Sequence, residues 1–285
     1  MPSPSTAALT LLMTTALLLK SAVADDSTVS PAQLRDTRDP SQDTDDMLQR
    51  YVDEFVHVTP GSGLFPEVLR ADERLLVPPA PFRIARYETT QELYRAVTGT
   101  NPSRWPGPRN SVDSVSRQDA EVFCTRITEF LRRRGSIGPK ETVRLPTQTE
   151  WEYSCRGGSA ESYCFGNIRD DADLQTLGEY AWHTGNAAGN DPAVGVLRPN
   201  QFGLCDMHGY LWEHVAADPG AATNSNASSV QLPVEFAMGG SWRDHHKLLA
   251  SDCRIPVPVY AVSDAIGFRC VLASDEGDRK NSDKQ

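Results

Sequence analysis

The chain has 285 residues, a formal net charge of −10 and a sequence pI near 5.1. Hydrophobic residues make up 39% of it and charged residues 23%, an ordinary globular composition that supports a sizeable core. The acidic balance argues against a nucleic-acid-binding protein, because such a protein needs a basic surface to neutralise phosphates.

The first segment along the chain resembles an export signal. Ala7–Leu19 is apolar and Ala22–Ala24 reads as a small-x-small cleavage site. Although no Lys or Arg precedes the run, it is too short to span a bilayer, so we favour a cleaved signal peptide (1–24) over a membrane anchor or a buried helix. The mature chain is then expected to have no membrane span and to be secreted or periplasmic.

The flanks of the domain are polar. Residues 25–46 are rich in Asp, Ser, Thr and Pro and are expected to form a disordered linker, because they cannot bury enough apolar surface to order themselves. The tail, 274–285, has a similar composition. The folded domain is therefore expected over residues 47–273.

Three helices are predicted from capping boxes, in which a hydroxyl accepts a backbone N–H and the side chain three residues later reaches back. The boxes are Thr89–Glu92, Ser116–Asp119 and Thr147–Glu150. Glycines at 99, 135 and 157 are expected to end the helices. Beyond Gly158 no segment has helical periodicity, and short strand-like pieces alternate with loops. The pattern predicts a single α+β domain with little regular secondary structure.

The cysteines indicate disulfides. Their even number in a chain expected to be exported favours pairing, and no CxxC pair suggests zinc or thioredoxin-like chemistry. Six cysteines allow fifteen pairings, among which spacing alone does not choose. They are Cys124, Cys155, Cys164, Cys205, Cys253 and Cys270.

Six motifs follow one another in order: YETTQELYRAVTGTNPSRW, VSRQDAEVFC, RLPTQTEWEYSCRGG, RPNQFGLCDMHGYLWE, GGSW and IGFRC. Over about Phe82 to Ala273 they resemble the formylglycine-generating enzyme family, also called the sulfatase-modifying factor domain. The resemblance implies a variant of the C-type-lectin-like fold. It also implies two disulfides, Cys124–Cys270 and Cys155–Cys253, which makes Cys253 a structural residue and not a nucleophile. Whether the two remaining cysteines pair stays open.

The family's enzymes oxidise a sulfatase-peptide cysteine to formylglycine with molecular oxygen and two copper-binding cysteines. Those cysteines follow the Ser of GGS by three and eight residues, which in this chain gives Asp244 and Leu249. Leucine cannot ligate a metal, and aspartate is a hard oxygen donor where Cu(I) is held by soft thiolates. Neither copper nor formylglycine generation is therefore expected.

His245 and His246 follow Asp244 and raise the possibility of another metal site. Adjacent residues of an extended segment point to opposite faces, so the three cannot easily meet one ion. We favour a polar loop that, with Trp242, lines a ligand groove. Trp105, Trp182 and Trp212 are further candidates for this groove or for the core.

The resemblance also implies a calcium site. Asp206 and Glu213 would supply carboxylate oxygens, and Gly209 and Leu211 would supply backbone carbonyls. Calcium takes several hard oxygen ligands in a flexible cage, which fits this set. The alternative is that the two acidic residues only cap turns.

Three functions follow from the sequence. The favoured one is an exported binding module for a protein, peptide or glycan, or an accessory that binds a sulfatase peptide without modifying it. The alternative is an oxygen- and metal-dependent oxidase of the same family whose ligands are not cysteines.

Overall fold

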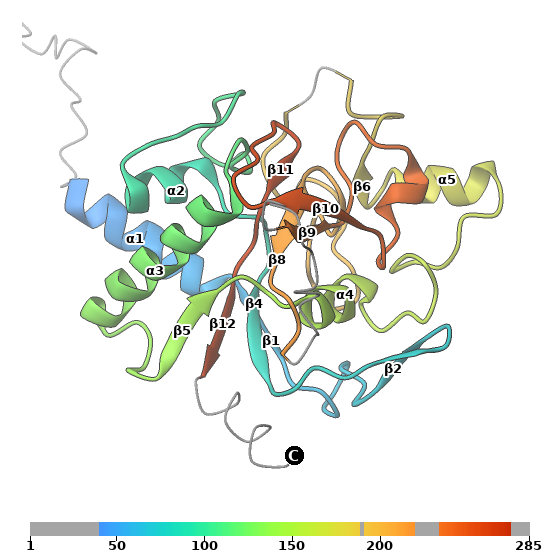
Figure 1. The fold of residues 1–285 in the computed structure, drawn as a ribbon, viewed down its shortest axis with the longest axis horizontal. Helices are drawn as coiled ribbons and strands as arrows, with labels where there is room; N and C mark the ends of the chain where they lie inside the picture. Colours follow the sequence, from blue (N-terminus) through green and yellow to red (C-terminus); the bar gives the residue numbers. More distant parts are fainter. Residues whose placement is uncertain (1–39, 189–190, 220–233, 275–285) are drawn as a thin grey trace, which may run out of the picture. The chain divides into compact units, whose positions relative to one another are not determined.

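The computed structural model describes residues 40–188, 191–219 and 234–274 (Figure 1). The expected signal peptide, linker residues 25–39 and tail residues 275–285 lie outside the described residues. Within the described ranges, no helix combines the length and the apolar character needed to cross a membrane.

Helix α1 (Pro40–Asp53) shows that the predicted linker and domain boundary are wrong from Pro40 onward. Its first turn contains Asp43, which interacts favourably with the helix dipole. Leu48 and Tyr51 are buried against the domain. This tertiary packing orders a segment whose polar composition had suggested disorder.

The first sheet contains four strands in the order β1-β4-β12-β5, all antiparallel. Their bounds are β1 Phe55–Val58, β4 Phe82–Ala85, β5 Glu141–Arg144 and β12 Val271–Ser274. The C-terminal strand β12 thus lies between strands from the first half of the chain (Figure 1).

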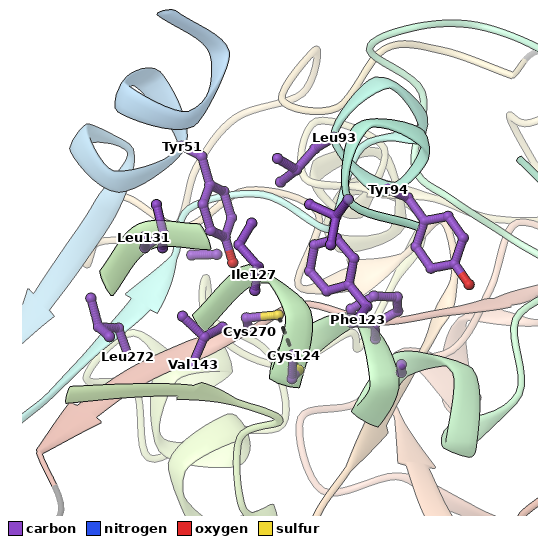
Figure 2. Packing of buried hydrophobic residues seen from close by; sticks show 14 of the residues in the cluster. Tyr51, Leu93, Tyr94, Phe123, Cys124, Ile127, Leu131, Val143, Cys270 and Leu272 are labelled. Atoms are coloured by element: carbon purple, nitrogen blue, oxygen red, sulfur yellow. Dashed lines mark hydrogen bonds between the residues drawn. The ribbon is translucent and has the colours of Figure 1, made fainter. Parts of the chain in front are cut away.

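Helices α2 (Gln91–Thr98) and α3 (Arg117–Arg134) share one hydrophobic core with α1 and this sheet. Figure 2 shows Ile127 and Leu131 of α3 on the side of Val143 and Leu272 of the sheet, and Phe123 beside Tyr94 of α2. Ala120, Phe123, Ile127 and Leu131, spaced three or four residues apart, form the buried face of α3.

The capping predictions are confirmed for α3 and for α4 (Gln148–Arg156), whose boxes begin at Ser116 and Thr147. The α2 prediction is wrong by one residue, because Thr90 and not Thr89 caps the helix. All three helices end at the predicted glycines, which adopt positive φ at little steric cost.

The second half is built around another four-stranded sheet, in the order β10-β9-β8-β11. Its strands are β8 Trp212–Val215, β9 Val234–Met238, β10 Arg254–Pro258 and β11 Ile266–Gly267. Two smaller pairs are β2 (Leu69–Ala71) with β3 (Arg74–Leu76), and β6 (Ala181–Trp182) with β7 (His208–Gly209). The prediction of a loop-rich β half is confirmed.

One helix of this half, α5 (Asp171–Leu177), contradicts the expectation that no helix follows Gly158. Asp170 caps it by accepting the N–H groups of Ala172 and Asp173. The helix is too short to show a helical period, which explains why the sequence did not reveal it.

Candidate functional site

The turn Gly239–Trp242 lies between β9 and a short 3₁₀ helix, His246–Leu249. Gly239 and Gly240 have φ of 102° and 78°. A Cβ at Gly240 would lie 2.7 Å from Leu249 Cδ1, so the close approach to the 3₁₀ helix requires glycine.

Asp244, the first of the two positions that the sequence resemblance assigns to a thiol, caps this turn. Its Oδ2 accepts the Ser241 N–H at 3.0 Å and the Trp212 Nε1–H at 2.8 Å. The Ser241 hydroxyl donates to the same oxygen. The carboxylate is therefore occupied by three donors and holds the loop in place.

Leu249, at the second thiol position, is a core residue with 0% exposure. It packs with Leu177 and Ala181, and its methyl groups approach Gly209 and Gly240. Neither position offers a group that binds a soft metal ion.

His245 and His246 lie side by side, with ring centroids 3.9 Å apart. The expectation that they point to opposite faces is wrong, because His246 begins the 3₁₀ helix and the segment is not extended. His183 was not among the sequence candidates. It approaches the same loop, since the Thr184 N–H donates to the Asp244 carbonyl. Burial and the two neighbouring histidines lower the pKa of His183.

Among the described residues, no group of three or more His, Cys, Asp or Glu is arranged to hold a metal ion. The three histidines therefore do not form a ready-made ligand set. The three histidines lie at or beside this loop, whereas the Asp244 side chain points inward and accepts hydrogen bonds from Ser241 and Trp212.

The predicted calcium ligands lie around a buried ion pair. Glu213 accepts the Arg269 Nε–H and Nη2–H at 2.7 Å each, and it also accepts the Trp151 Nε1–H at 2.8 Å. Asp206 accepts the Gly195 N–H at 2.6 Å. Gly209 in β7 and Leu211 between β7 and β8 are both buried.

Glu88 joins this cluster, although nothing in its sequence context marked it. It is 2% exposed, and its carboxylate oxygens accept no hydrogen bond of ordinary length, although the nearby Ser111 hydroxyl acts to lower its pKa. Burial, with the nearby Glu213 and Asp206, raises the pKa of Glu88 well above its ordinary value. Burial also raises the pKa of Asp206 to about 6.

The cluster thus combines three acidic residues with one arginine. The oxygens of Glu88 and the carboxylate of Asp206 suit a hard cation such as calcium, whereas Glu213 already has a cationic partner. Calcium stays a prediction, and Glu88 is a further carboxylate beside the residues predicted to bind it.

All six cysteines are free thiols in this structure. The Sγ atoms of Cys124 on α3 and Cys270 before β12 are 3.7 Å apart in the buried core (Figure 2). Contact with Cys270, together with burial, raises the pKa of Cys124. The first expected pair is thus adjacent, and the disulfide itself stays a prediction.

The second expected pair is not in contact. Cys155 Sγ lies 3.3 Å from the Met207 carbonyl and 3.6 Å from the His208 ring, whereas Cys253 Sγ faces the Lys247 carbonyl at 3.1 Å. The Cys155–Cys253 disulfide stays a prediction, and whether the two remaining cysteines pair stays open.

A cavity of about 200 Å³ opens beside the Gly239–Trp242 turn. Of the four residues predicted to share a groove, Trp242 lines this cavity, whereas Asp244 and the two adjacent histidines do not. The lining residues are Trp105, Ser111, Asp113, Ala187, Asp191, Tyr210, Leu211, Trp242 and Asp264. Trp212 is instead a core residue, and Trp182 is partly buried in the cluster behind the cavity.

Comparison with known proteins agrees with the motif order. The family model of the sulfatase-modifying factor enzyme 1-like domain matches residues 41–274. Chaperone protein LppX of Paenibacillus barcinonensis is 24% identical over 212 residues, which cover 56% of this chain and 76% of that protein. The formylglycine-generating enzyme of Thermomonospora curvata is 28% identical over 247 residues, which cover 78% of this chain and 72% of the enzyme.

Two further matches are informative. The inactive C-alpha-formylglycine-generating enzyme 2 of Bos taurus is 30% identical over 168 residues, covering 55% of this chain and 48% of that protein. Among solved structures, Treponema denticola variable protein 1 superposes with a TM-score of 0.60 at 20% identity, covering 76% of this chain and 94% of that chain. The predicted fold, an α+β variant of the C-type-lectin-like fold, is confirmed.

Proposed function

The chain belongs to the family of the sulfatase-modifying factor enzyme 1-like domain, and from this premise we propose that it is an exported binding or accessory module that does not generate formylglycine. This proposal rests on the observation that both positions assigned to thiols have structural roles. Asp244 caps the turn through three hydrogen bonds, and Leu249 fills the core beneath it. A copper thiolate pair would have to replace both roles.

The relatives support the accessory part of this proposal. One is named a chaperone and another an inactive member of the formylglycine-generating group. The apolar segment Ala7–Leu19 and the cleavage motif after it support export. The cavity beside Trp242 supplies a place for part of an exported protein or a sulfatase peptide to bind.

The binding role is tested with a fluorescent sulfatase-derived peptide that contains the unmodified cysteine, followed by anisotropy. We expect saturable binding that a copper chelator does not change and that Trp242→Ala weakens. Val262→Ala is a matched control, since Val262 is exposed and lies outside the cavity lining. Binding that requires copper, or an absence of binding at millimolar peptide, would contradict the proposal.

A second candidate is a metal- and oxygen-dependent oxidase with ligands other than cysteine, and the gathering of His183, His245 and His246 favours it. Metal analysis of the purified protein separates the two candidates. A binding module should contain no stoichiometric transition metal. An oxidase of this kind should contain one that is lost in the double variant His245→Ala/His246→Ala.

We further propose that calcium occupies the acidic cluster. Asp206 and Glu88 would hold it, which would balance buried negative charge that Arg269 alone leaves uncompensated. Calcium should then raise the melting temperature of the wild type relative to a chelator, by mass action. Asp206→Asn and Glu88→Gln should each remove that increase. An equal increase in all three proteins would show that calcium acts elsewhere.

A further inference from the structure

The cavity beside the Gly239–Trp242 turn has aromatic walls. Tyr210 is buried at 3% exposure, Trp242 is partly buried, and Trp105 is half exposed. The Trp242 N–H donates to the Tyr210 carbonyl at 2.8 Å, which fixes the two aromatic residues relative to each other. Flat aromatic faces in such a pocket attract alkyl chains and organic cations.

The same cavity is lined by three aspartates from separate parts of the chain. Asp264 forms ion pairs with Arg104 and Arg243 at the surface. Asp113 and Asp191, in contrast, have no basic partner among the residues that the structure describes. Asp113 accepts the Arg104 N–H and the Ser114 hydroxyl, and Asp191 accepts the Asn110 amide at 2.7 Å.

The electrostatics of these two carboxylates follow from this arrangement. Burial raises the pKa of Asp191, and burial together with Asp191 and Asp264 raises the pKa of Asp113. Asp113 is 4% exposed and Asp191 is partly buried. Carboxylates in such positions without a counter-ion are costly, and a cation placed between them would offset that cost.

A third feature of this cavity is a buried hydroxyl group on its wall. Ser111 is 1% exposed and lines the cavity, and its hydroxyl makes no hydrogen bond of ordinary length, although its interaction with the Glu88 carboxylate lowers the pKa of that group. Buried hydroxyls nearly always have full hydrogen-bond partners, so the acceptor side of this oxygen is available to a ligand in the cavity. Its oxygen can accept a hydrogen bond from an N–H donor.

The volume of the cavity limits how large a bound group can be. A cavity of about 200 Å³ is smaller than the roughly 300–1,000 Å³ of pockets that hold whole drug-sized ligands. It has room for one long side chain, and the half-exposed Trp105 can contact the rest of the ligand outside. An extended molecule that inserts one end therefore fits better than a compact ligand.

We propose that this cavity binds the cationic end of an extended ligand, an alkylammonium or guanidinium group of the kind carried by lysine and arginine side chains. Trp105, Tyr210 and Trp242 would contact the aliphatic stem and the cation. Asp113 and Asp191 would pair with the charge, and Ser111 would accept an N–H. The inference rests on the proposed binding function and specifies what part of a peptide or protein this site recognises.

The test uses isothermal titration calorimetry with n-butylguanidinium, n-butylammonium and neutral N-butylurea on the full folded chain. At least one cation should bind saturably, and at least tenfold more tightly than the urea. The double variant Asp113→Asn/Asp191→Asn keeps the acceptor oxygens for Arg104 and Asn110 and should weaken cation binding at least tenfold. Glu129→Gln, an exposed charge on α3, is the matched control and should bind as the wild type does.

Equal affinity for the urea and the cations, no cation binding at millimolar concentration, or unchanged cation binding in the double variant would each overturn the proposal. Circular dichroism of the double variant establishes that it is folded. A failure here is distinct from a failure of the proposed function, because the sulfatase-peptide anisotropy measurement decides that question without reference to these probes.

Discussion

Asp244, the first position to which the sequence resemblance assigns a catalytic cysteine, has a structural role in this chain. One carboxylate oxygen accepts the Ser241 N–H, the Ser241 hydroxyl and the Trp212 indole N–H. The sequence shows that residue 244 carries no sulfur, but it does not reveal the cap. The Trp212 donor comes from a strand that lies 32 residues earlier in the chain.

This cap gives a prediction at the residue scale. Asp244→Ala should lower the free energy of unfolding by about 2–4 kcal/mol, because it leaves buried donors without an acceptor. Asp244→Asn, which keeps one acceptor oxygen, should cost less. Urea unfolding measures both effects.

Asp252→Ala is the matched control for this prediction. Asp252 lies in the next turn, its side chain is 42% exposed, and it makes only a 3.5 Å ion pair with Arg74. Its replacement should change stability by less than about 1 kcal/mol. If Asp244→Ala costs no more than this control, Asp244 does not hold the loop.

At the scale of elements, local chemistry made α3 and α4 predictable. Ser116 and Thr147 satisfy the first backbone N–H groups through side chains three residues apart, so the signal lies within one turn. Helix α1 has Pro40 at its first position, which is a weaker start signal than a hydroxyl capping box. It forms because Leu48 and Tyr51 are buried by α2, α3 and the sheet, which only tertiary structure reveals.

The contact between α3 and the C-terminal strand gives an element-scale prediction. Cys124 and Cys270 are 146 positions apart in the chain and 3.7 Å apart in the core. In protein produced under oxidising conditions, peptide mapping should find them joined. The joined form should be more stable than the double variant Cys124→Ser/Cys270→Ser by about 5 kcal/mol in the chain-entropy model.

The control for the disulfide prediction is the reduced wild-type protein, which keeps both sulfur atoms in the core. Its free energy of unfolding should be close to that of the double variant, apart from the cost of burying two serine hydroxyls in the variant. Recovery of Cys124 as a free thiol from oxidised, folded protein would contradict the pairing.

At the scale of the whole molecule, the motif order was sufficient to predict the fold, because fixed motifs in sequence imply fixed neighbours in space. The site was only partly predictable. Trp242 was expected in the groove, but the aspartates of the cavity lie in three distant segments, and no short motif unites them. Glu88 was missed for the same reason, since it meets Asp206 and Glu213 only in the folded chain.

The buried histidines give a prediction for the pH dependence of the molecule. His214 is fully buried, and burial lowers its pKa to about 4. In the unfolded chain the His214 imidazole takes up a proton near pH 6.5, whereas in the folded chain it stays neutral at that pH. Stability from neutral His214 is therefore present above pH 6.5 and is lost as pH falls towards 4.

Urea unfolding at pH 7 and pH 5 measures this effect. His214 should account for about 2 kcal/mol of the stability lost between these pH values. His214→Asn should be less stable overall but should lose correspondingly less on acidification. His57→Asn, at an exposed position of β1, is the matched control and should follow the wild type. An unchanged pH dependence in His214→Asn would contradict the assignment.

The central claim is that the chain lacks the reaction of the formylglycine-generating enzymes because both thiol positions are structural. Mass spectrometry of a cysteine-containing sulfatase peptide, incubated with the purified protein, copper and oxygen, tests it most directly. The formylglycine-generating enzyme of Thermomonospora curvata, assayed in parallel, is the positive control. We predict no conversion by this chain under conditions in which the control converts the peptide. Formylglycine formed by the wild-type chain above the level of copper alone would contradict the account.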